Sequence, residues 1–307
     1  MPHLLAGVTS SRMRQLLAQR FVADPTYRVL HYLLGPERVL EWVHSVGVTT
    51  DRALAECVPP LPPIEFRQIT AEVEPALFLY TGFYDLTTLV TLYHAHASPP
   101  PQPARVLDFG CGGGRMTRFL DPVQWEVYAS EVNPDHVAWC RANLPNVDTR
   151  QNGYAPPLSF GDGYFDFVFS LSIFSHLSHK MIRVWLRELA RVSRPGGVVM
   201  VTFHGAHALR VTAESADHQA MLQLSPKEAH DILDRLPHEQ VVLLPYGEEL
   251  IRTAKVGTSD YGTTFIDPTF ALEMGKEHGF EPLALIPAGM RGFQDILVLR
   301  RVADTQR

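Results

Sequence analysis

Residues 106–114 read Val-Leu-Asp-Phe-Gly-Cys-Gly-Gly-Gly, so a short apolar segment ends at an acid and passes directly into glycines. A continuous apolar run is typical of a parallel strand, because both faces of such a strand are covered. Glycines behind it let the backbone approach a ligand without a Cβ atom in the way. The segment therefore predicts a buried parallel strand that ends in a ligand-binding loop.

The loop has the spacing D-x-G-x-G-x-G and begins at Asp108. It differs from a P-loop, which ends in Gly-Lys-Ser/Thr, and from the dinucleotide fingerprint, which requires glycine where Arg115 stands. A carboxylate two residues before Gly110 repels a pyrophosphate but suits a ligand with an ammonium group. S-adenosylmethionine carries an amino group and a sulfonium, so the sign of the charge favours this cofactor.

A second acid, Glu131, ends the predicted strand 126–131 and comes 21 positions after Gly110. In doubly wound folds an acid about 20 residues past the glycine loop accepts hydrogen bonds from ribose hydroxyls. Each signal is weak by itself, because a turn or an acid at the end of a strand is common. Their order and spacing together predict a nucleoside site.

At this point the chain resembles the class I S-adenosylmethionine-dependent methyltransferases, over about residues 104–205. The resemblance includes Asn133-Pro134-Asp135-His136 after the second acid, Phe165-Asp166-Phe167-Val168-Phe169 as a fourth strand, and the turn Arg191-Val192-Ser193-Arg194-Pro195-Gly196-Gly197. It implies an α/β fold of the Rossmann-like kind: a doubly wound, mostly parallel sheet with an antiparallel last strand. It also implies S-adenosylmethionine as cofactor and methyl transfer as the reaction.

The resemblance further implies which positions surround the cofactor. They are Asp108, Gly110 and Gly112 at its methionine part, Glu131 at the ribose, Asn152 or Gly153 at the adenine, Leu171 or Ser172 near the methionine carbons, and Tyr80, Thr81 and Gly82 as a roof, with Cys111 and Val132 also in the site. The adenine position departs from the family, in which many members have Asp where this chain has Gln151-Asn152-Gly153. We expect the Cys111 thiol to pack, since redox thiols usually stand in C-x-x-C pairs.

Alternation of strands and helices predicts a parallel sheet covered on both faces. We expect strands at 105–109, 126–131, 147–151, 165–171 and 198–204, helices at 113–120, 134–144 and 179–192, an irregular stretch to about residue 265, and closing strands at 282–287 and 294–300. Amphipathic segments in 10–58 and an aromatic-rich helix at 74–96 precede this core. The chain thus divides into an N-terminal helical cap, residues 1–100, and a core, 101–307, with a substrate insert at about 206–265.

Composition limits the partners of the chain. A net charge of −6 argues against nucleic acid, whose binding needs clustered Lys and Arg. No run approaches the about 18 apolar residues of a membrane span, and the first residues lack a secretory signal, so we expect a cytoplasmic protein with no membrane partner and a small-molecule substrate. Three cysteines without metal spacing fit a reducing compartment and no metal site.

Two histidines follow predicted strands at the edge where ligands bind in open parallel sheets. His176 comes after the fourth strand and His204 ends the fifth, so either is a candidate general base; the alternative is that each only caps a helix or hydrogen-bonds to backbone. We give equal weight to the two readings for His204 and favour the structural one for His176. Asp260, Tyr261, Arg291 and Gln294 are further substrate candidates.

These patterns predict methyl transfer to an oxygen or nitrogen of a small metabolite, such as a sugar or a natural-product intermediate. Two alternatives stay open. A nicotinamide-dependent dehydrogenase would share Glu131 but would want a glycine at Arg115 and no acid at Asp108. A catalytically silent, cofactor-binding regulatory module would use the helical segment as a partner surface.

Overall fold

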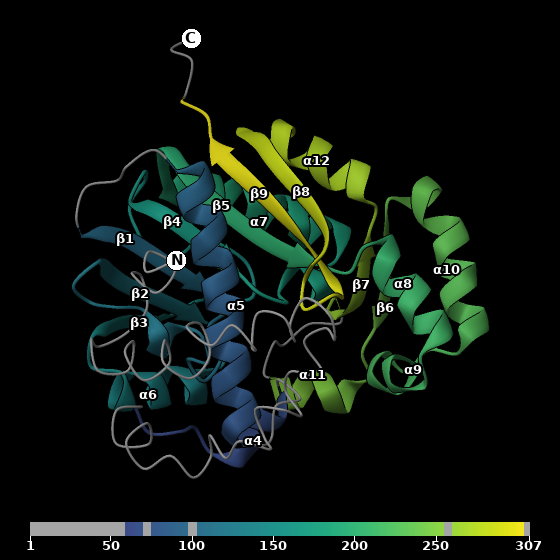
Figure 1. Ribbon diagram of the computed structural model, residues 1–307, viewed down its shortest axis with the longest axis horizontal. Coiled ribbons are helices and arrows are strands. Elements are labelled where there is room, and N and C mark those ends of the chain that lie inside the picture. Colours follow the sequence, from purple (N-terminus) through teal and green to yellow (C-terminus); the bar gives the residue numbers. More distant parts are fainter. Residues whose placement is uncertain (1–58, 70–74, 98–102, 255–259, 304–307) are drawn as a thin grey trace, which may run out of the picture. The chain divides into compact units, whose positions relative to one another are not determined.

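The structure is a computed structural model that describes residues 59–69, 75–97, 103–254 and 260–303 (Figure 1). The helices expected within residues 10–58 lie outside these ranges. The chain divides into two compact units: the first comprises residues 1–95 and 100–150, and the second comprises residues 96–99 and 151–307. Each unit is described by itself.

The main sheet confirms the predicted fold class. Its seven strands have the order β3-β2-β1-β4-β5-β9-β8. β1 runs parallel to β2, β4 runs parallel to β5, and β9 is antiparallel to both β5 and β8. The strands are β1 (Ala104–Phe109), β2 (Trp125–Glu131), β3 (Val147–Gln151), β4 (Phe165–Ser170), β5 (Ser193–Phe203), β8 (Phe280–Met290) and β9 (Gln294–Arg301).

The first unit carries β1, β2 and helices α4 (Ile64–Ile69), α5 (Pro75–His96) and α6 (Pro134–Asn143). α5 confirms the helix expected at 74–96, and three of its aromatic side chains, Phe78, Phe83 and Tyr93, are buried as core packing requires. α6 begins where the Asn133 side chain accepts a hydrogen bond from the Asp135 backbone N–H.

The expected helix at 113–120 is wrong. After β1 the chain makes turns and then only a short 3-10 helix, η4 (Thr117–Phe119). The reason lies in the glycines: Gly112 and Gly114 have φ angles of +52° and +71°, in the left-handed region that a right-handed helix excludes. The same glycines that predict a ligand loop therefore delay the helix.

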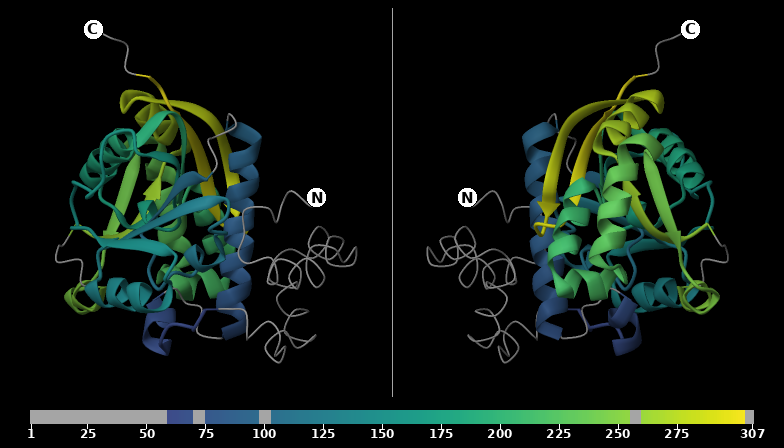
Figure 2. Two further views of the ribbon diagram at one scale, coloured as in Figure 1. Left: turned by 90° about the vertical axis from the view of Figure 1, so that its left-hand side faces the viewer. Right: turned by 90° about the vertical axis from the view of Figure 1, so that its right-hand side faces the viewer.

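The second unit contains α7 (His179–Val192), whose bounds match the prediction and whose stripe at helical spacing is buried: Met181, Ile182, Trp185, Leu186 and Leu189. β8 and β9 confirm the two closing strands, and they run side by side in Figure 1 and in both views of Figure 2. α12 (Pro268–Glu277) packs on β8 and begins at Asp267, whose carboxylate accepts two backbone N–H groups.

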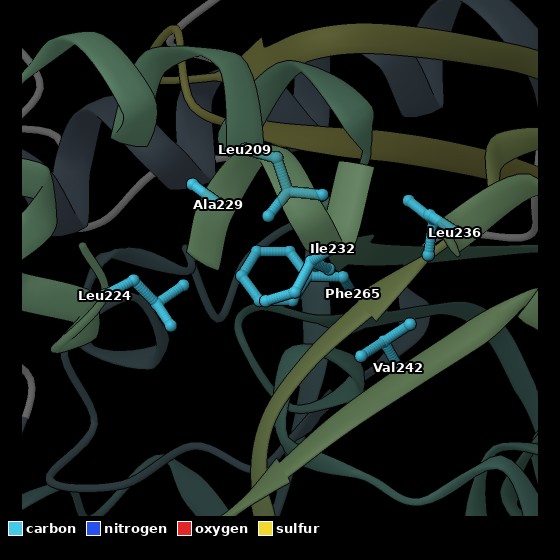
Figure 3. Packing of buried hydrophobic residues seen from close by; sticks show 7 residues of the cluster. All are labelled: Leu209, Leu224, Ala229, Ile232, Leu236, Val242 and Phe265. Atoms are coloured by element: carbon cyan, nitrogen blue, oxygen red, sulfur yellow. The ribbon is translucent and has the colours of Figure 1, made fainter. Parts of the chain in front are cut away.

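The stretch expected to be irregular, 206–265, is largely regular. It forms α8 (Ala206–Glu214), α9 (Ala216–Leu222), α10 (Pro226–Glu239), β6 (Val241–Pro245), α11 (Glu248–Ala254) and β7 (Gly262–Ile266). α10 starts at a capping box between Ser225 and Glu228. Figure 3 shows why the segment folds: Leu209, Leu224, Ala229, Ile232, Leu236, Val242 and Phe265 make a small hydrophobic core of their own.

β6 and β7 pair as an antiparallel ribbon, and β7 contacts β5 and the short 3-10 helix η5 (Phe174–His176) that follows β4. Tyr261 forms an isolated bridge with Leu177, and Phe265 forms one with His204. The Thr264 hydroxyl donates to the Leu177 carbonyl at 2.9 Å. The ribbon thus fixes both candidate histidines against its edge. No helix in the described residues is long and apolar enough to cross a membrane.

Candidate functional site

The glycine loop follows β1 in the first unit. Gly110 has a φ angle of +82°, and the backbone N–H groups of Gly110 and Cys111 both donate to the Ser130 carbonyl, at 2.9 and 3.1 Å. A residue with a Cβ atom rarely adopts the φ angles of Gly110 and Gly112. The loop conformation therefore requires glycine at both positions. The loop therefore turns back on the end of β2, where Glu131 stands.

Glu131 is buried, and each of its carboxylate oxygens accepts a hydrogen bond from a backbone N–H group. Oε2 accepts from the Gly112 N–H and Oε1 accepts from the Asn133 N–H, each at 2.9 Å. A carboxylate has about four lone-pair sites, so two remain for hydroxyl donors. The acid thus locks the glycine loop to the start of α6 and can still receive a diol. Val132 follows it and is half-buried.

Asp108 is 1% exposed and only half satisfied. Its Oδ2 atom accepts from the Thr117 hydroxyl at 2.5 Å, and its Oδ1 atom has no hydrogen-bond partner among the described residues. Burial raises the pKa of Asp108 to about 7, while the Thr117 hydrogen bond and the nearby Arg115 charge lower it and Glu131 raises it. A cationic ligand group at Oδ1 would supply the missing partner.

The Cys111 thiol packs as expected. Cys111 and Cys140 are free and buried, and both sulfurs approach the Gly112 carbonyl, at 3.5 and 3.4 Å. Their neighbours are apolar, with Ala129 and Leu144 in the same cluster. Its contact with the Cys140 thiol and its burial raise the pKa of Cys111 well above the usual value, so the thiolate nucleophile is disfavoured.

The predicted roof residues lie on α5. A Cβ atom at Gly82 would stand 2.3 Å from the Arg115 carbonyl oxygen, so this glycine allows α5 to contact the loop that follows β1. Arg115 also pairs with buried Asp85 at 2.7 Å. Thr81 is buried and donates to the Leu77 carbonyl within the helix. The Tyr80 backbone is helical, and its side chain is outside the described part of the structure.

The remaining cofactor candidates belong to the second unit. Asn152 follows β3; its amide nitrogen donates to the Gly153 carbonyl at 2.7 Å, and its Oδ1 atom is buried without a partner among the described residues. An exocyclic amine would fit that oxygen. Leu171 is buried, and Ser172 adopts a left-handed φ angle of +58° directly after β4.

A closed network of hydrogen bonds surrounds Ser172 and explains its backbone. The Ser172 N–H donates to the Thr202 hydroxyl at 2.9 Å, and that hydroxyl donates to Gln294 Oε1 at 2.6 Å. The Gln294 amide nitrogen then donates to Ser172 Oγ at 2.8 Å and contacts His204 Nε2 at 3.2 Å. Because the amide oxygen is used by Thr202, the amide nitrogen must be the donor and His204 Nε2 the acceptor.

The His204 imidazole is therefore neutral, and the lone pair on its Nε2 atom already accepts a hydrogen bond from Gln294. Burial, with a smaller contribution from His176, lowers the pKa of His204 to about 3. Its ring packs against Phe265 and Phe293, at centroid distances of 5.7 and 5.3 Å. Its Nδ1 atom is buried and has no partner among the described residues.

His176 lies in a different setting, among tyrosines. Its Nδ1 atom is 3.0 Å from the Gly262 carbonyl oxygen and 3.0 Å from the Tyr246 hydroxyl. Its ring centroid lies 5.8 Å from that of Tyr246 and 5.3 Å from that of Tyr261. Burial lowers the pKa of His176, and the Gly262 carbonyl opposes this. The imidazole is thus neutral near pH 7.

Of the other substrate candidates, Tyr261 and Gln294 contact the histidines, whereas Asp260 is exposed and its carbonyl accepts from the Tyr154 hydroxyl at 2.7 Å. Arg291 stands in the turn between β8 and β9 with a φ angle of +52°. Sequence reasoning missed the residues that hold these side chains: Thr117, Tyr154, Thr202, Tyr246 and Thr263. Only Thr202, near the end of β5 and two residues before His204, had a positional signal.

Comparison with known proteins finds similarity to methyltransferases. A family model described as a methyltransferase domain matches residues 106–197. An uncharacterized methyltransferase of Synechocystis is 30% identical over 33% of this chain and 47% of its own length. Norajmaline N-methyltransferase of Rauvolfia serpentina is 25% identical over 73% of this chain and 84% of its own. Fatty-acid O-methyltransferase of Mycolicibacterium smegmatis is 35% identical over 37% of this chain and 42% of its own. The chain spans less than half the length of the first curated relatives it matches.

Proposed function

We propose that the protein, whose residues 106–197 match a methyltransferase domain, is a class I S-adenosylmethionine-dependent methyltransferase that transfers the donor's methyl group to an oxygen or nitrogen of a small metabolite, such as a sugar or a natural-product intermediate. The observation that carries the proposal is the unsatisfied Oδ1 atom of buried Asp108, beside a loop that Glu131 holds in place. A buried carboxyl with a free oxygen and a raised pKa is suited to bind a cation.

The residues of the first unit fit the donor. Asp108 would hold the donor's ammonium group, the bare backbone of Gly110 and Gly112 would face its methionine part, and the two spare lone-pair sites of Glu131 would take the ribose hydroxyls. The family resemblance also assigns Asn152 to the adenine and Leu171 or Ser172 to the methionine carbons. Val132, Gly153, Tyr80 and Gly82 stay in the proposed donor site through the family resemblance alone.

The acceptor side of the proposal rests on the second unit. The insert predicted at about 206–265 places Tyr246 and Tyr261 around His176 and packs Phe265 on His204. Aromatic surfaces of this kind favour an organic acceptor, and a net charge of −6 disfavours a nucleic acid. One of the relatives named above is an N-methyltransferase and another an O-methyltransferase, so both atoms belong to the proposal.

Calorimetric titration of the purified chain with S-adenosylhomocysteine and, separately, with NADH tests the donor. We expect binding of the first and not of the second; the reverse result favours the dehydrogenase alternative. Isotopically labelled S-adenosylmethionine incubated with a metabolite extract then tests transfer. Labelled product that disappears in Asp108→Ala supports the proposal, whereas tight donor binding with no transfer to any metabolite favours a silent regulatory module.

A further inference from the structure

We propose that Asp85 is a positioning residue of the donor site: it holds the Arg115 guanidinium and thereby leaves the Oδ1 atom of Asp108 open to a cationic ligand. The inference rests on the proposed binding of S-adenosylmethionine at Asp108, and it extends the donor site from the glycine loop to helix α5. All three side chains belong to the first unit of the chain.

Arg115 raises an electrostatic question, because it directly follows the glycines of a loop proposed to bind a cation. Its positive charge acts on Asp108 through space and lowers the pKa of that carboxyl. A guanidinium also donates hydrogen bonds in the geometry that suits a carboxylate. Without another partner, Arg115 would therefore bind Asp108 in place of the donor's ammonium group.

Helix α5 supplies that other partner. A Cβ atom at Gly82 would stand 2.3 Å from the Arg115 carbonyl oxygen, so the backbones of the helix and the loop are in close contact here. Residues three apart on a helix share a face, so Asp85 lies on the same side of α5 as Gly82. Arg115 Nη1 donates to Asp85 Oδ2 at 2.7 Å. The glycine thus allows the approach at which the ion pair forms.

The ion pair is shielded from water. The Asp85 side chain is fully buried, and that of Arg115 is 10% exposed. Salt screens a buried pair only weakly, and removal of one partner leaves an uncompensated charge in the interior. If Asp85 is removed, the guanidinium therefore needs another acceptor close by.

Asp108 is the carboxyl on which a released guanidinium would act. Its Oδ2 atom accepts from the Thr117 hydroxyl at 2.5 Å, and its Oδ1 atom is buried with no hydrogen-bond partner among the described residues. The titratable groups Glu131 and Cys111, which also act on it, carry no positive charge. One oxygen is left, for which Arg115 and the donor's ammonium group compete. Pairing with Asp85 neutralises the guanidinium and leaves that oxygen to the donor.

The test removes Asp85 with and without its partner. Asp85→Leu has a similar size but neither a charge nor an acceptor, so it releases Arg115. Asp85→Leu/Arg115→Met removes both charges, a replacement that buried ion pairs often tolerate. Glu126→Leu is the control, because it removes the acid of an exposed ion pair in the same unit, with Arg105 at 2.9 Å.

The first measurement needs no ligand. NMR titration of the Asp108 carboxyl, with Asp108→Asn identifying the resonance, gives its pKa in each variant. We expect Asp85→Leu to lower this pKa by about 1–3 units, because a positive charge then bonds to the carboxylate. The double variant should return the pKa to the parent value or above, since the attraction of Arg115 is gone. Glu126→Leu should leave it unchanged.

The second measurement is calorimetry at pH 8 with S-adenosylhomocysteine, which carries the ammonium group, and with 5′-methylthioadenosine, which lacks it. Asp85→Leu should lose up to about 10–10³-fold in affinity for the first ligand, because each pKa unit by which Arg115 stabilises the Asp108 carboxylate is a factor of ten that the ligand must overcome. The affinity for the second ligand should be unchanged. The double variant should recover the parent's affinity for the first.

A merely structural role of Asp85 predicts a different pattern, in which both ligands lose affinity alike and removal of Arg115 restores nothing. That pattern, or an Asp108 pKa that stays in place or rises in Asp85→Leu, overturns the inference. If Asp85→Leu does not fold, Asp85→Asn keeps an acceptor without the charge and should show the same selective loss to a smaller extent; an equal loss for both ligands, or no loss, then overturns it. A parent chain that binds neither ligand contradicts the proposed function instead, while the pKa of Asp108 still tests the pairing.

Discussion

The backbone N–H of Gly112 donates to Oε2 of Glu131 across 2.9 Å. The acid that ends β2 is therefore part of the loop that ends β1, and the second oxygen of the same carboxylate holds the Asn133 N–H at the start of α6. A residue proposed to bind the ribose thus also sets the shape of the glycine loop. Variants at this position should affect stability as well as donor binding.

Glu131→Gln tests this double role. The amide oxygen can keep one of the two backbone bonds, but the amide NH₂ faces the other backbone N–H and leaves it unsatisfied. We expect the free energy of unfolding to fall by about 1–3 kcal/mol, together with a clear loss of affinity for S-adenosylhomocysteine. Urea unfolding and calorimetry measure the two effects. Glu126→Gln, at an exposed position of the same strand, is the control, and equal effects in both variants would contradict the assignment.

Asp108→Asn should stabilise the ligand-free chain while it weakens donor binding. The folded pKa of about 7 lies above the ordinary value of 3.8, so the folded state binds the proton more tightly than the unfolded state. The stability of the parent chain therefore falls as pH rises from about 4 to about 7, by at most about 1.4 kcal/mol per pH unit. The variant lacks this loss and can keep the Thr117 hydrogen bond. Thermal unfolding at pH 8 should show a higher Tm; a lower Tm contradicts the burial argument.

The affinity for S-adenosylmethionine should rise with pH through about 7, because the cationic donor selects the ionised form of Asp108. Calorimetry across this range should give a sloping profile for the parent and for Asp234→Asn, which changes an exposed carboxylate on α10. Asp108→Asn should give a weaker and flatter profile. A parent profile as flat as that of the variant would mean that the carboxyl does not contact the donor's charge.

Thr117→Val removes the hydroxyl that the structure places on Asp108, with little change of shape. The hydroxyl favours the ionised carboxylate, so its loss should raise the pKa of Asp108 further. The midpoint of the affinity profile should then move to higher pH, with the plateau affinity retained. NMR titration of the Asp108 carboxyl in the ligand-free chain reports the same shift directly, and an unmoved or lowered midpoint contradicts it.

Sequence reasoning succeeded where local pattern and tertiary structure agree. The apolar run into Asp108, the acid at Glu131 and the stripe of the helix at 179–192 all came out at their predicted places. It failed at 113–120, where the glycines that make the loop adopt φ angles closed to a helix. It also failed in the insert, whose helices are stabilised by a core shared with Phe265, a residue on a later strand.

Site residues divide in the same way. The positions of His176 and His204 follow from strand order, but their protonation sites depend on Gly262 and Gln294, which lie 86 and 90 residues away along the chain. No spacing rule predicts that Gln294 fills the lone pair of His204, since this requires the register between β5 and β9. Strand order therefore predicts where the two histidines lie but not which ring nitrogen of each carries the proton.

Acid unfolding tests the account of His204. Its folded pKa of about 3 lies below the ordinary value of 6.5, so the unfolded state takes up a proton that the folded state refuses. The stability that this residue contributes is present above about pH 6.5 and is lost as pH falls toward 3, with a slope of at most about 1.4 kcal/mol per pH unit.

His204→Gln cannot titrate, although its amide oxygen can still accept the Gln294 hydrogen bond. The variant should therefore unfold in urea with a weaker dependence on pH between about 4 and 6.5, whereas His230→Gln, which changes an exposed imidazole, should keep the steep dependence of the parent. A variant as acid-sensitive as the parent would show that His204 titrates in the folded state, and the Nε2 lone pair would then be open to a proton.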